Sequence, residues 1–227
     1  MLIVDELLLL ALDDTSGKRL ASSTNLDAAM AAAVLVELAL RERISIAPAE
    51  AGWRERGKIT VINTAPTDDP DLDAVLAKLS EKDGQKVKNL ISPMTWSPIS
   101  KGLRDRRLAR LVRQGVLAEE RSAVLGLRRH PTRDAGPEHE VRARLQSALV
   151  DGLTPTERTV ALIALLDAAG ILTKVVVVED KRALKARAKK LAEGDWAAKA
   201  VKDALAEMTA VMVSVSAGAA GGGNGGS

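Results

Sequence analysis

The sequence predicts a mainly α-helical fold, a single-domain helical bundle with short β-hairpins at its periphery. Hydrophobic residues make up 46% of the 227 residues, yet Phe and Tyr are absent and Trp occurs only three times. Good helix formers are therefore abundant, and the aromatic residues that favour strands are scarce. The length suits one domain that buries its own core, and the absence of Cys excludes disulfides, thiolate metal sites and Cys nucleophiles.

Apolar residues that recur with a helical period predict most of the elements. The predicted helices lie at 1–12, 26–43, 71–80, from 87 onward, 99–114, 137–150, 155–169, 181–191 and 196–208. Short alternating runs predict strands at 44–46 and 53–62, and a hairpin over 116–127.

Capping residues predict where two important helices begin. Asn25 is the expected N-cap of the second helix, whose many Ala residues predict close packing by its neighbours. Thr154, Pro155 and Glu157 have the spacing of an N-cap, a first-turn proline and a capping box. The run that follows, 160–166, is almost entirely apolar, so we expect this helix at the centre of the bundle.

The chain is predicted to form one domain over 1–216, followed by a disordered Gly-rich tail at 217–227. The tail has nothing to bury, so it should not order itself against the domain. The apolar run at 7–12 is too short to span a bilayer, which needs ~20 residues. Asp5 and Glu6 before it have the wrong charge for a secretory signal. We therefore expect a cytoplasmic protein that meets a membrane only at its surface.

The most informative stretch is 94–131, which contains a strongly basic helix. Between Lys101 and Arg113 there are six Lys or Arg and a single acid. Residues 99–144 carry 12 Lys or Arg against 6 Asp or Glu, although the net charge of the whole chain is only +3. A local basic surface on a nearly neutral chain favours a defined anionic partner.

Arginine suits a phosphate group because its planar fork can bind two oxygens together. Three cations spaced three apart on the basic helix and two at the end of the hairpin are the predicted headgroup-binding residues. They are Lys101, Arg104, Arg107, Arg128 and Arg129. Arg106, Arg110 and Arg113 share another face of the same helix. Near an anionic leaflet each cation is worth about 1 kcal/mol, so several together support reversible binding.

Other chemistry has little support in the sequence. Two His and no Cys leave few nucleophile–base pairs, and no metal-ligand, nucleophile or phosphate-loop motif is present. The acid pairs Asp13–Asp14 and Asp68–Asp69 lie in turn-forming sequence, where capping is the default role. We therefore expect no enzymatic activity, no metal and no cofactor. Trp96 and Trp196 are predicted to pack rather than to bind a ligand. For Trp53, which begins a polar alternating run, packing is favoured over partial exposure with a role at a lipid interface.

Two other functions stay open at this point. The basic helix, the turn and the hairpin could be the recognition helix and wing of a DNA-binding winged helix. The small net charge and the absence of Asn from the basic helix do not favour nucleic acid. Alternatively, the Arg face could meet an acidic partner tail in a protein–protein adaptor. Self-association also stays open.

Several motifs occur in the same order as in the Golgi phosphoprotein 3 family, which the chain resembles. They are Asp5-Glu6 with the Leu-rich run to Asp13-Asp14, Glu37-Leu38-Ala39-Leu40-Arg41 before Ile-Ser-Ile, Thr95-Trp96-x-Pro98 before the basic helix, Gly115-Val116-Leu117, His130-Pro131, and Arg158-x-x-Ala161-Leu162-Ile163. The composition, rich in Ala, Arg and Val, is similar to that of a bacterial member.

The resemblance implies a mostly helical, peripheral membrane protein. Eukaryotic members bind phosphatidylinositol 4-phosphate at the Golgi and act as adaptors for membrane enzymes. Anionic phospholipid or phosphoinositide headgroups and membrane-protein tails are therefore the implied partners. In the family's pocket, two basic-helix cations fall on Lys101 and Arg104, and a Trp and an Arg of the second wall fall on Ser22 and Ala31. The apolar hairpin that meets the bilayer would use Val124, Leu125 and Leu127.

Overall fold

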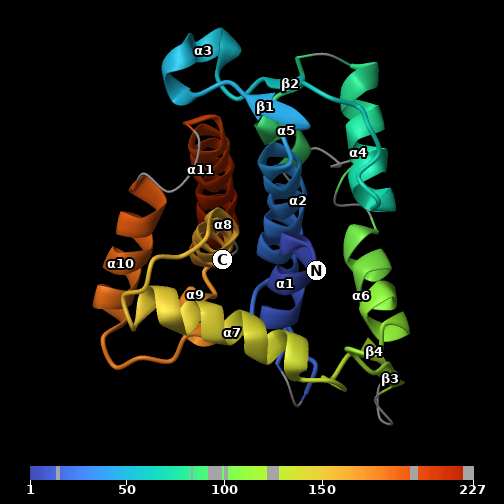
Figure 1. The fold of residues 1–227 in the computed structure, drawn as a ribbon, viewed down its shortest axis with the longest axis vertical. Coiled ribbons are helices and arrows are strands. Elements are labelled where there is room, and N and C mark those ends of the chain that lie inside the picture. Colours follow the sequence, from blue (N-terminus) through green and yellow to red (C-terminus); the bar gives the residue numbers. More distant parts are fainter. Residues whose placement is uncertain are drawn as a thin grey trace, which may run out of the picture.

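The computed structural model describes residues 1–13, 16–82, 84–91, 99, 102–121, 128–194 and 199–221. The chain is mainly helical, which confirms the predicted fold class (Figure 1). The helices are α1 (Ile3–Leu10), α2 (Ser23–Leu40), α3 (Gly52–Glu55), α4 (Pro70–Glu81), α5 (Val87–Ile91), α6 (Leu103–Arg113), α7 (Gly136–Leu149), α8 (Glu157–Ala168), α9 (Leu172–Val175), α10 (Lys181–Glu193) and α11 (Lys199–Gly221), with a 3-10 turn, η1, at Ala49–Ala51. Strands β1 (Ile44–Ile46) and β2 (Ile59–Val61) form one antiparallel pair, and β3 (Glu120–Arg121) and β4 (Arg128–Arg129) form another.

The centre of the bundle is α2, against which α1, α8 and α11 pack. Its many Ala residues let these neighbours approach closely, and the side chains from Ala28 to Ala39 are buried. Within the described part of the chain, α2 is also the helix long and apolar enough to cross a membrane, with a mean hydropathy of 1.4. Because 72% of that window is buried inside the protein, its apolarity is explained by its place in the core.

Two of the family-like motifs meet in this core as ion pairs. Glu37 on α2 accepts hydrogen bonds from the backbone N–H of Ile3, at 2.9 Å, and from Nη1 of Arg158 on α8, at 3.0 Å. Burial alone would raise the pKa of Glu37, but the hydrogen bonds and charge of Arg158 outweigh it and lower that pKa. The motif residues Glu37 and Arg158 therefore fasten α1, α2 and α8 to one another.

Both predicted N-caps are displaced from the observed ones. The N-cap of α2 is Ser22, whose Oγ accepts from the backbone N–H of Asn25 at 3.2 Å. The N-cap of α8 is Thr156, whose Oγ1 accepts from the N–H of Thr159 at 3.3 Å. Each helix start offers several capping side chains within a few residues, so composition alone does not select one. The central position predicted for α8 is confirmed, because Thr159 through Leu166 are buried or nearly so.

The segment 53–62 is not a continuous strand. Its first residues form α3, and only Ile59–Val61 pairs with β1, in the register Ile44 with Val61 and Ile46 with Ile59. The side chain of Trp53 on α3 is 79% exposed, so the predicted packing role of this tryptophan is wrong. Trp96 and Trp196 lie outside the described residues.

The last helix extends further than the sequence predicts. It runs without a break from Lys199 to Gly221, so residues 217–221, predicted as the start of a disordered tail, are helical. Adding residues to an existing helix is far easier than starting one, so the Ala-rich end of this segment continues it. Residues 222–227 lie outside the described residues, and the domain boundary at 216 stays a prediction.

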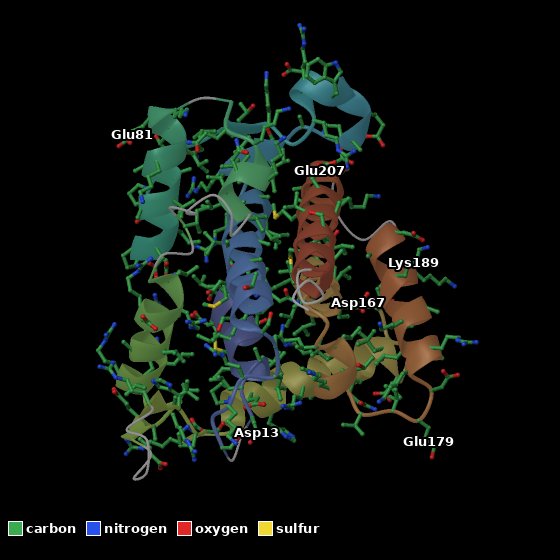
Figure 2. All side chains as sticks on the ribbon, turned by 180° about the vertical axis from the view of Figure 1, so that it is seen from behind. Asp13, Glu81, Asp167, Glu179, Lys189 and Glu207 are labelled. Atoms are coloured by element: carbon green, nitrogen blue, oxygen red, sulfur yellow. The ribbon has the colours of Figure 1, made fainter. Side chains whose placement is uncertain are left out.

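The α1–α2 loop and the β3–β4 hairpin lie at one end of the long axis, and α3 lies at the other (Figure 1). Figure 2 shows the molecule from behind, with Asp13 at the end that carries the α1–α2 loop and Glu81 near the opposite end. Helices α4 and α6 follow one another along one edge (Figure 1). A hairpin is present near the predicted one, but its strands lie later in the chain than the predicted 116–127, because β3 at 120–121 pairs with β4 at 128–129. Its apolar residues Val124, Leu125 and Leu127 fall outside the described part of the chain.

Candidate anion-binding site

A cavity of about 590 Å³ lies where the α1–α2 loop, the start of α2, α6 and the hairpin meet. Leu8, Leu12 and Leu108 form its apolar floor. Five cations and two acids are among its lining residues, namely Lys18, Arg19, Arg104, Arg128 and Arg129 against Asp105 and Glu119. The formal charge of the lining is therefore positive, as an anion-binding site requires.

The structure brings together several residues that were predicted from distant parts of the sequence. The cavity is lined by Arg104 of α6, by Arg128 and Arg129 of β4, and by Ser22 at the start of α2. Lys101 lies outside the described residues.

Ala31 does not line this cavity, contrary to its predicted place in the second wall. It is fully buried in the core-facing part of α2, two and a half turns from Ser22.

Arg107 is also wrongly predicted as a headgroup-binding residue, because its side chain is 0% exposed. Its guanidinium forms a bidentate pair with Asp69, its Nε lies 3.0 Å from Oδ2 of Asp71, and its Nη1 lies 3.5 Å from Oδ1 of Asp5. Each three-residue step along an α-helix falls about 60° short of a full turn. Arg107 is therefore rotated from Arg104 toward α1 and α4, away from the cavity.

The acids around Arg107 show what this buried cluster does. Burial raises the pKa of Asp5, although the charge of Arg107 opposes the shift. At Asp69 burial also acts to raise the pKa, but the hydrogen bonds and charge of Arg107 outweigh it and lower that pKa. The cluster thus joins α1, the start of α4 and α6, and it holds α6 in place beside the cavity.

Two cations that sequence reasoning missed, Lys18 and Arg19, come from the α1–α2 loop. The loop is shaped by Asp13, whose Oδ1 accepts from the N–H of Ser16 at 2.7 Å and from Oγ of Ser16 at 2.6 Å. Lys18 and Arg19 are exposed and form no salt bridge with another described residue. The only sequence signal was a turn directly followed by two cations, which by itself does not place them at a site.

Gly17 allows this loop to lie against the end of the hairpin. Its φ is +61°, in the left-handed region, and a Cβ atom there would lie 2.6 Å from the backbone N of His130. Only glycine fits both the backbone conformation and the close approach. The contact between Gly17 and His130 therefore brings Lys18 and Arg19 to the same cavity as Arg128 and Arg129.

The cations of the cavity differ in how strongly they are already paired. Arg104 donates from Nη1 to Oδ1 of Asp27 at 2.9 Å, and Arg128 lies 3.7 Å from Glu119. Burial raises the pKa of Asp27, although Arg104 and Arg19 act against the shift. An arriving anion therefore meets Lys18 and Arg19 directly but competes with Asp27 for Arg104.

The positive lining suits the cavity to binding an anion. Burial lowers the pKa of His130; the charge of Glu119 opposes this shift and that of Arg128 adds to it. Within the described residues no group of three or more His, Asp or Glu could hold a metal ion. Leu103, Arg107 and Leu111 are buried against the bundle, so only the other faces of the described part of α6 can meet a partner.

Comparison with known proteins agrees with this architecture. The family model of Golgi phosphoprotein 3 (GPP34) matches residues 3–208, which include every element of the cavity. A similar protein is the "Vacuolar protein sorting-associated protein 74" of Eremothecium gossypii, 28% identical over 207 residues, a match that covers 78% of this chain. The matched region spans 62% of that relative's length. The chain belongs to the Golgi phosphoprotein 3 family.

Proposed function

We propose that this protein is a peripheral, non-enzymatic binding protein that docks on the cytoplasmic face of a membrane by holding an anionic phospholipid headgroup in the cavity. The observation that supports the proposal most is the convergence of Lys18, Arg19, Arg104, Arg128 and Arg129 on one cavity. Family membership agrees with a membrane-associated role, and the relative's name refers to protein sorting at the vacuole.

The ligand that fits the cavity best carries a phosphate monoester, as phosphoinositides do. A monoester bears nearly two negative charges at neutral pH and offers several oxygens to guanidinium groups. A cavity of about 590 Å³ lies within the roughly 300–1,000 Å³ that is usual for small-ligand sites. A phosphoinositide-like headgroup is therefore our proposed ligand.

The second wall of the cavity differs from the one that the family resemblance implies. Ser22 carries no charge and Ala31 is buried in α2, whereas the α1–α2 loop brings Lys18 and Arg19 to the site. We therefore propose that these two cations replace the missing pair. Because their side chains are exposed and flexible, they should tolerate more than one headgroup.

Flotation with liposomes tests this proposal. The wild-type protein should float with phosphatidylcholine vesicles that contain phosphatidylinositol 4-phosphate, and much less with phosphatidylcholine alone. The variant Arg19→Glu/Arg129→Glu should bind more than about tenfold more weakly, since each cation near an anionic surface is worth about 1 kcal/mol. The matched control Arg182→Glu/Lys185→Glu changes the same net charge on exposed positions of α10, and it should bind almost as well as wild type.

Equal flotation of the Arg19→Glu/Arg129→Glu variant and wild type would contradict the proposed site. A gel shift with duplex DNA serves as the second arm. Binding to DNA with a steep salt dependence, without binding to vesicles, would replace the lipid proposal with the nucleic-acid alternative.

A further inference from the structure

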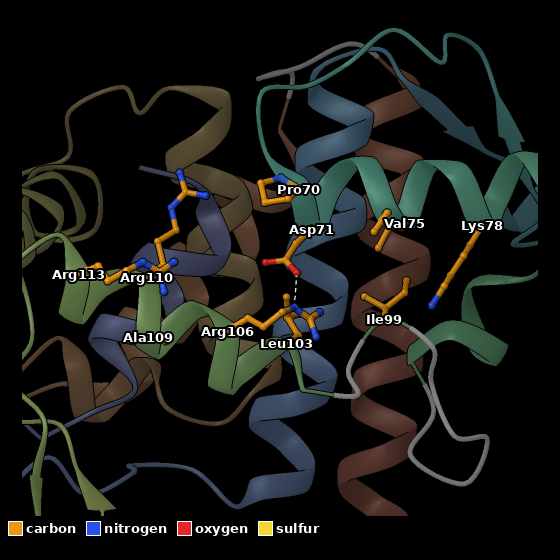
Figure 3. Close-up of a pocket in the computed structure, with 11 residues that line it drawn as sticks. Pro70, Asp71, Val75, Lys78, Ile99, Leu103, Arg106, Ala109, Arg110 and Arg113 are labelled. Atoms are coloured by element: carbon orange, nitrogen blue, oxygen red, sulfur yellow. Dashed lines mark hydrogen bonds and ion pairs between the residues drawn. The ribbon is translucent and has the colours of Figure 1, made fainter.

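A second concave surface lies along another face of α6, and Ala109 is the one described residue that it shares with the headgroup cavity. A groove of about 840 Å³ lies between α4 and α6 (Figure 3). Pro70, Val75 and Lys78 line it from α4, and Leu103, Arg106 and Arg113 line it from α6. On α4 the lining residues Pro70, Ala74 and Lys78 recur every four residues. On α6 the lining residues Leu103, Arg106, Arg110 and Arg113 recur every three or four, so the groove follows one face of each helix.

Small side chains keep this groove open. Ala74 on α4 and Ala109 on α6 are exposed and line it, whereas Val75 and Leu103 form a buried apolar base. From Pro70 to Lys78 the groove wall is about 12 Å long at 1.5 Å per helical residue. That length matches two to three turns of a helical peptide.

The rim of the groove is cationic. Arg113 and Arg110 lie toward one end, Arg106 lies in the middle and Lys78 toward the other end (Figure 3). Asp71 is the acid among the described lining residues. The lining therefore carries a clear positive excess, and it is spread along the groove rather than gathered at one point.

Two acids beneath the rim fix the direction of its arginines. Arg106 donates from Nε to Oδ1 of Asp71 at 2.5 Å, and Arg110 pairs with Asp69. The side chain of Arg106 nevertheless stays 53% exposed. Because these guanidinium groups are already oriented, a ligand that binds them loses less conformational entropy on binding.

We propose that this groove binds an acidic, amphipathic helical segment of a partner protein. The apolar base would hold the partner's hydrophobic side chains, and Lys78, Arg106 and Arg113 would face its carboxylates. An amphipathic helix in a hydrophobic groove is a common mode of peptide recognition, and the charged rim selects the sign of the peptide. The charged residues that line the groove are not among those that line the headgroup cavity, so the protein could hold a lipid and a partner together.

Fluorescence polarisation with a designed probe tests the groove. The probe is a fluorescein-labelled peptide of about three helical turns with Leu on one face and Glu on the other. The wild-type protein should bind it saturably, and the same peptide with Gln in place of Glu should bind more than about tenfold more weakly. Lys78→Glu/Arg113→Glu should cause a loss of similar size, whereas Arg182→Glu/Lys190→Glu on α10 should cause little change.

A steric variant separates the effect of the groove's shape on probe binding from the effect of its charge. Ala74→Trp at an exposed helix position fills the groove without changing its charge, so it should also abolish probe binding while the thermal unfolding midpoint stays near that of wild type. Both groove variants should keep wild-type flotation with phosphoinositide vesicles, which makes this test independent of the proposed function. Any one of three results would overturn the assignment to an acidic partner segment. The Glu and Gln probes could bind equally, the Lys78→Glu/Arg113→Glu variant could bind the probe fully, or the groove variants could lose vesicle binding.

Discussion

Arg104 and Arg107 are the same residue type one turn apart on α6, yet the structure gives them opposite roles. Arg104 is partly exposed, lines the cavity and pairs with one acid among the described residues, Asp27. Arg107 is fully buried and contacts three acids from α1 and from the start of α4. The role of each arginine is decided by the acidic residues that other parts of the chain place beside it. A count of positive charges along a helix therefore overestimates the number available to a ligand.

The largest expected effect is on stability. Arg107→Ala removes the buried cation that Asp5, Asp69 and Asp71 share, and only Asp69 and Asp71 keep a second salt-bridge partner among the described residues, in Arg110 and Arg106. It should lower the free energy of unfolding by roughly 3–5 kcal/mol. Arg104→Ala removes a partly exposed pair and should cost about 1 kcal/mol or less. Urea unfolding followed by circular dichroism measures both. If the two variants were equally stable, the division between a structural and a ligand-facing arginine would be wrong.

The next effect concerns the loop that supplies Lys18 and Arg19. Gly17→Ala forces a side chain into a left-handed backbone position and into the backbone of His130, and it should cost on the order of 1–3 kcal/mol. Vesicle binding should fall in parallel, because the loop can no longer lie against the hairpin. Gly152→Ala has a similar positive φ but no neighbour within 4 Å, so it is the matched control for backbone strain alone. Equal losses of vesicle binding in both variants would argue against the proposed loop placement.

A smaller effect should appear when the loop cations are removed singly. Arg19→Ala should weaken binding to phosphoinositide vesicles by about fivefold, since one cation near an anionic surface is worth about 1 kcal/mol. Its free energy of unfolding should stay within about 0.5 kcal/mol of wild type, because Arg19 is exposed and forms no salt bridge with a described residue. Arg107→Lys, which keeps the charge but loses the bidentate fork, should show the reverse pattern. A stability loss in Arg19→Ala equal to that of Arg107→Lys would contradict the comparison.

The smallest effect is a pH dependence that originates at Asp27. The pKa of this carboxyl is raised in the folded protein, so the native state holds its proton at a pH where the unfolded chain has lost it. The stability that the Asp27 carboxyl contributes therefore falls as the pH rises from its ordinary pKa of 3.8 through its raised pKa. Protonation at the lower end of that window also releases Arg104 to the ligand. Asp27→Asn should thus bind vesicles more tightly at neutral pH and show a flatter pH profile than wild type, measured by flotation on the same lipid mixture.

The contribution of Asp69 to stability should change with pH in the opposite direction. Its pKa is lowered in the folded state, so its stabilising contribution is present above the ordinary pKa of 3.8 and is lost as pH falls through the lowered value. Acid unfolding of the wild-type protein should therefore be steeper than that of a variant that lacks the Arg107 cluster.

Local patterns in the sequence predicted the helices because apolar periodicity is itself local. The helices α4 and α7 lie within a residue of their predicted boundaries. The roles of individual arginines could not be predicted in this way. Asp69 pairs with Arg107 across 38 positions, and Lys18 shares a cavity with Arg129 across a longer separation still. Such tertiary contacts leave no periodic signal. The burial of the Ala-rich helix that contains Ala31 was predicted from its composition, and the error was the place in the cavity wall that the family resemblance implied for Ala31.

The most direct test of the central claim is a titration of the isotopically labelled protein with a soluble inositol phosphate, followed by NMR spectroscopy of the backbone amides. We predict saturable shifts at Lys18, Arg19, Arg104, Arg128 and Arg129, with little change at Val75 and Lys78 on α4. Loss of these shifts in Arg19→Glu/Arg129→Glu would confirm that the cavity holds the anion. Shifts that cluster along the α4–α6 groove instead, or no saturable shifts at all, would contradict the proposed headgroup site.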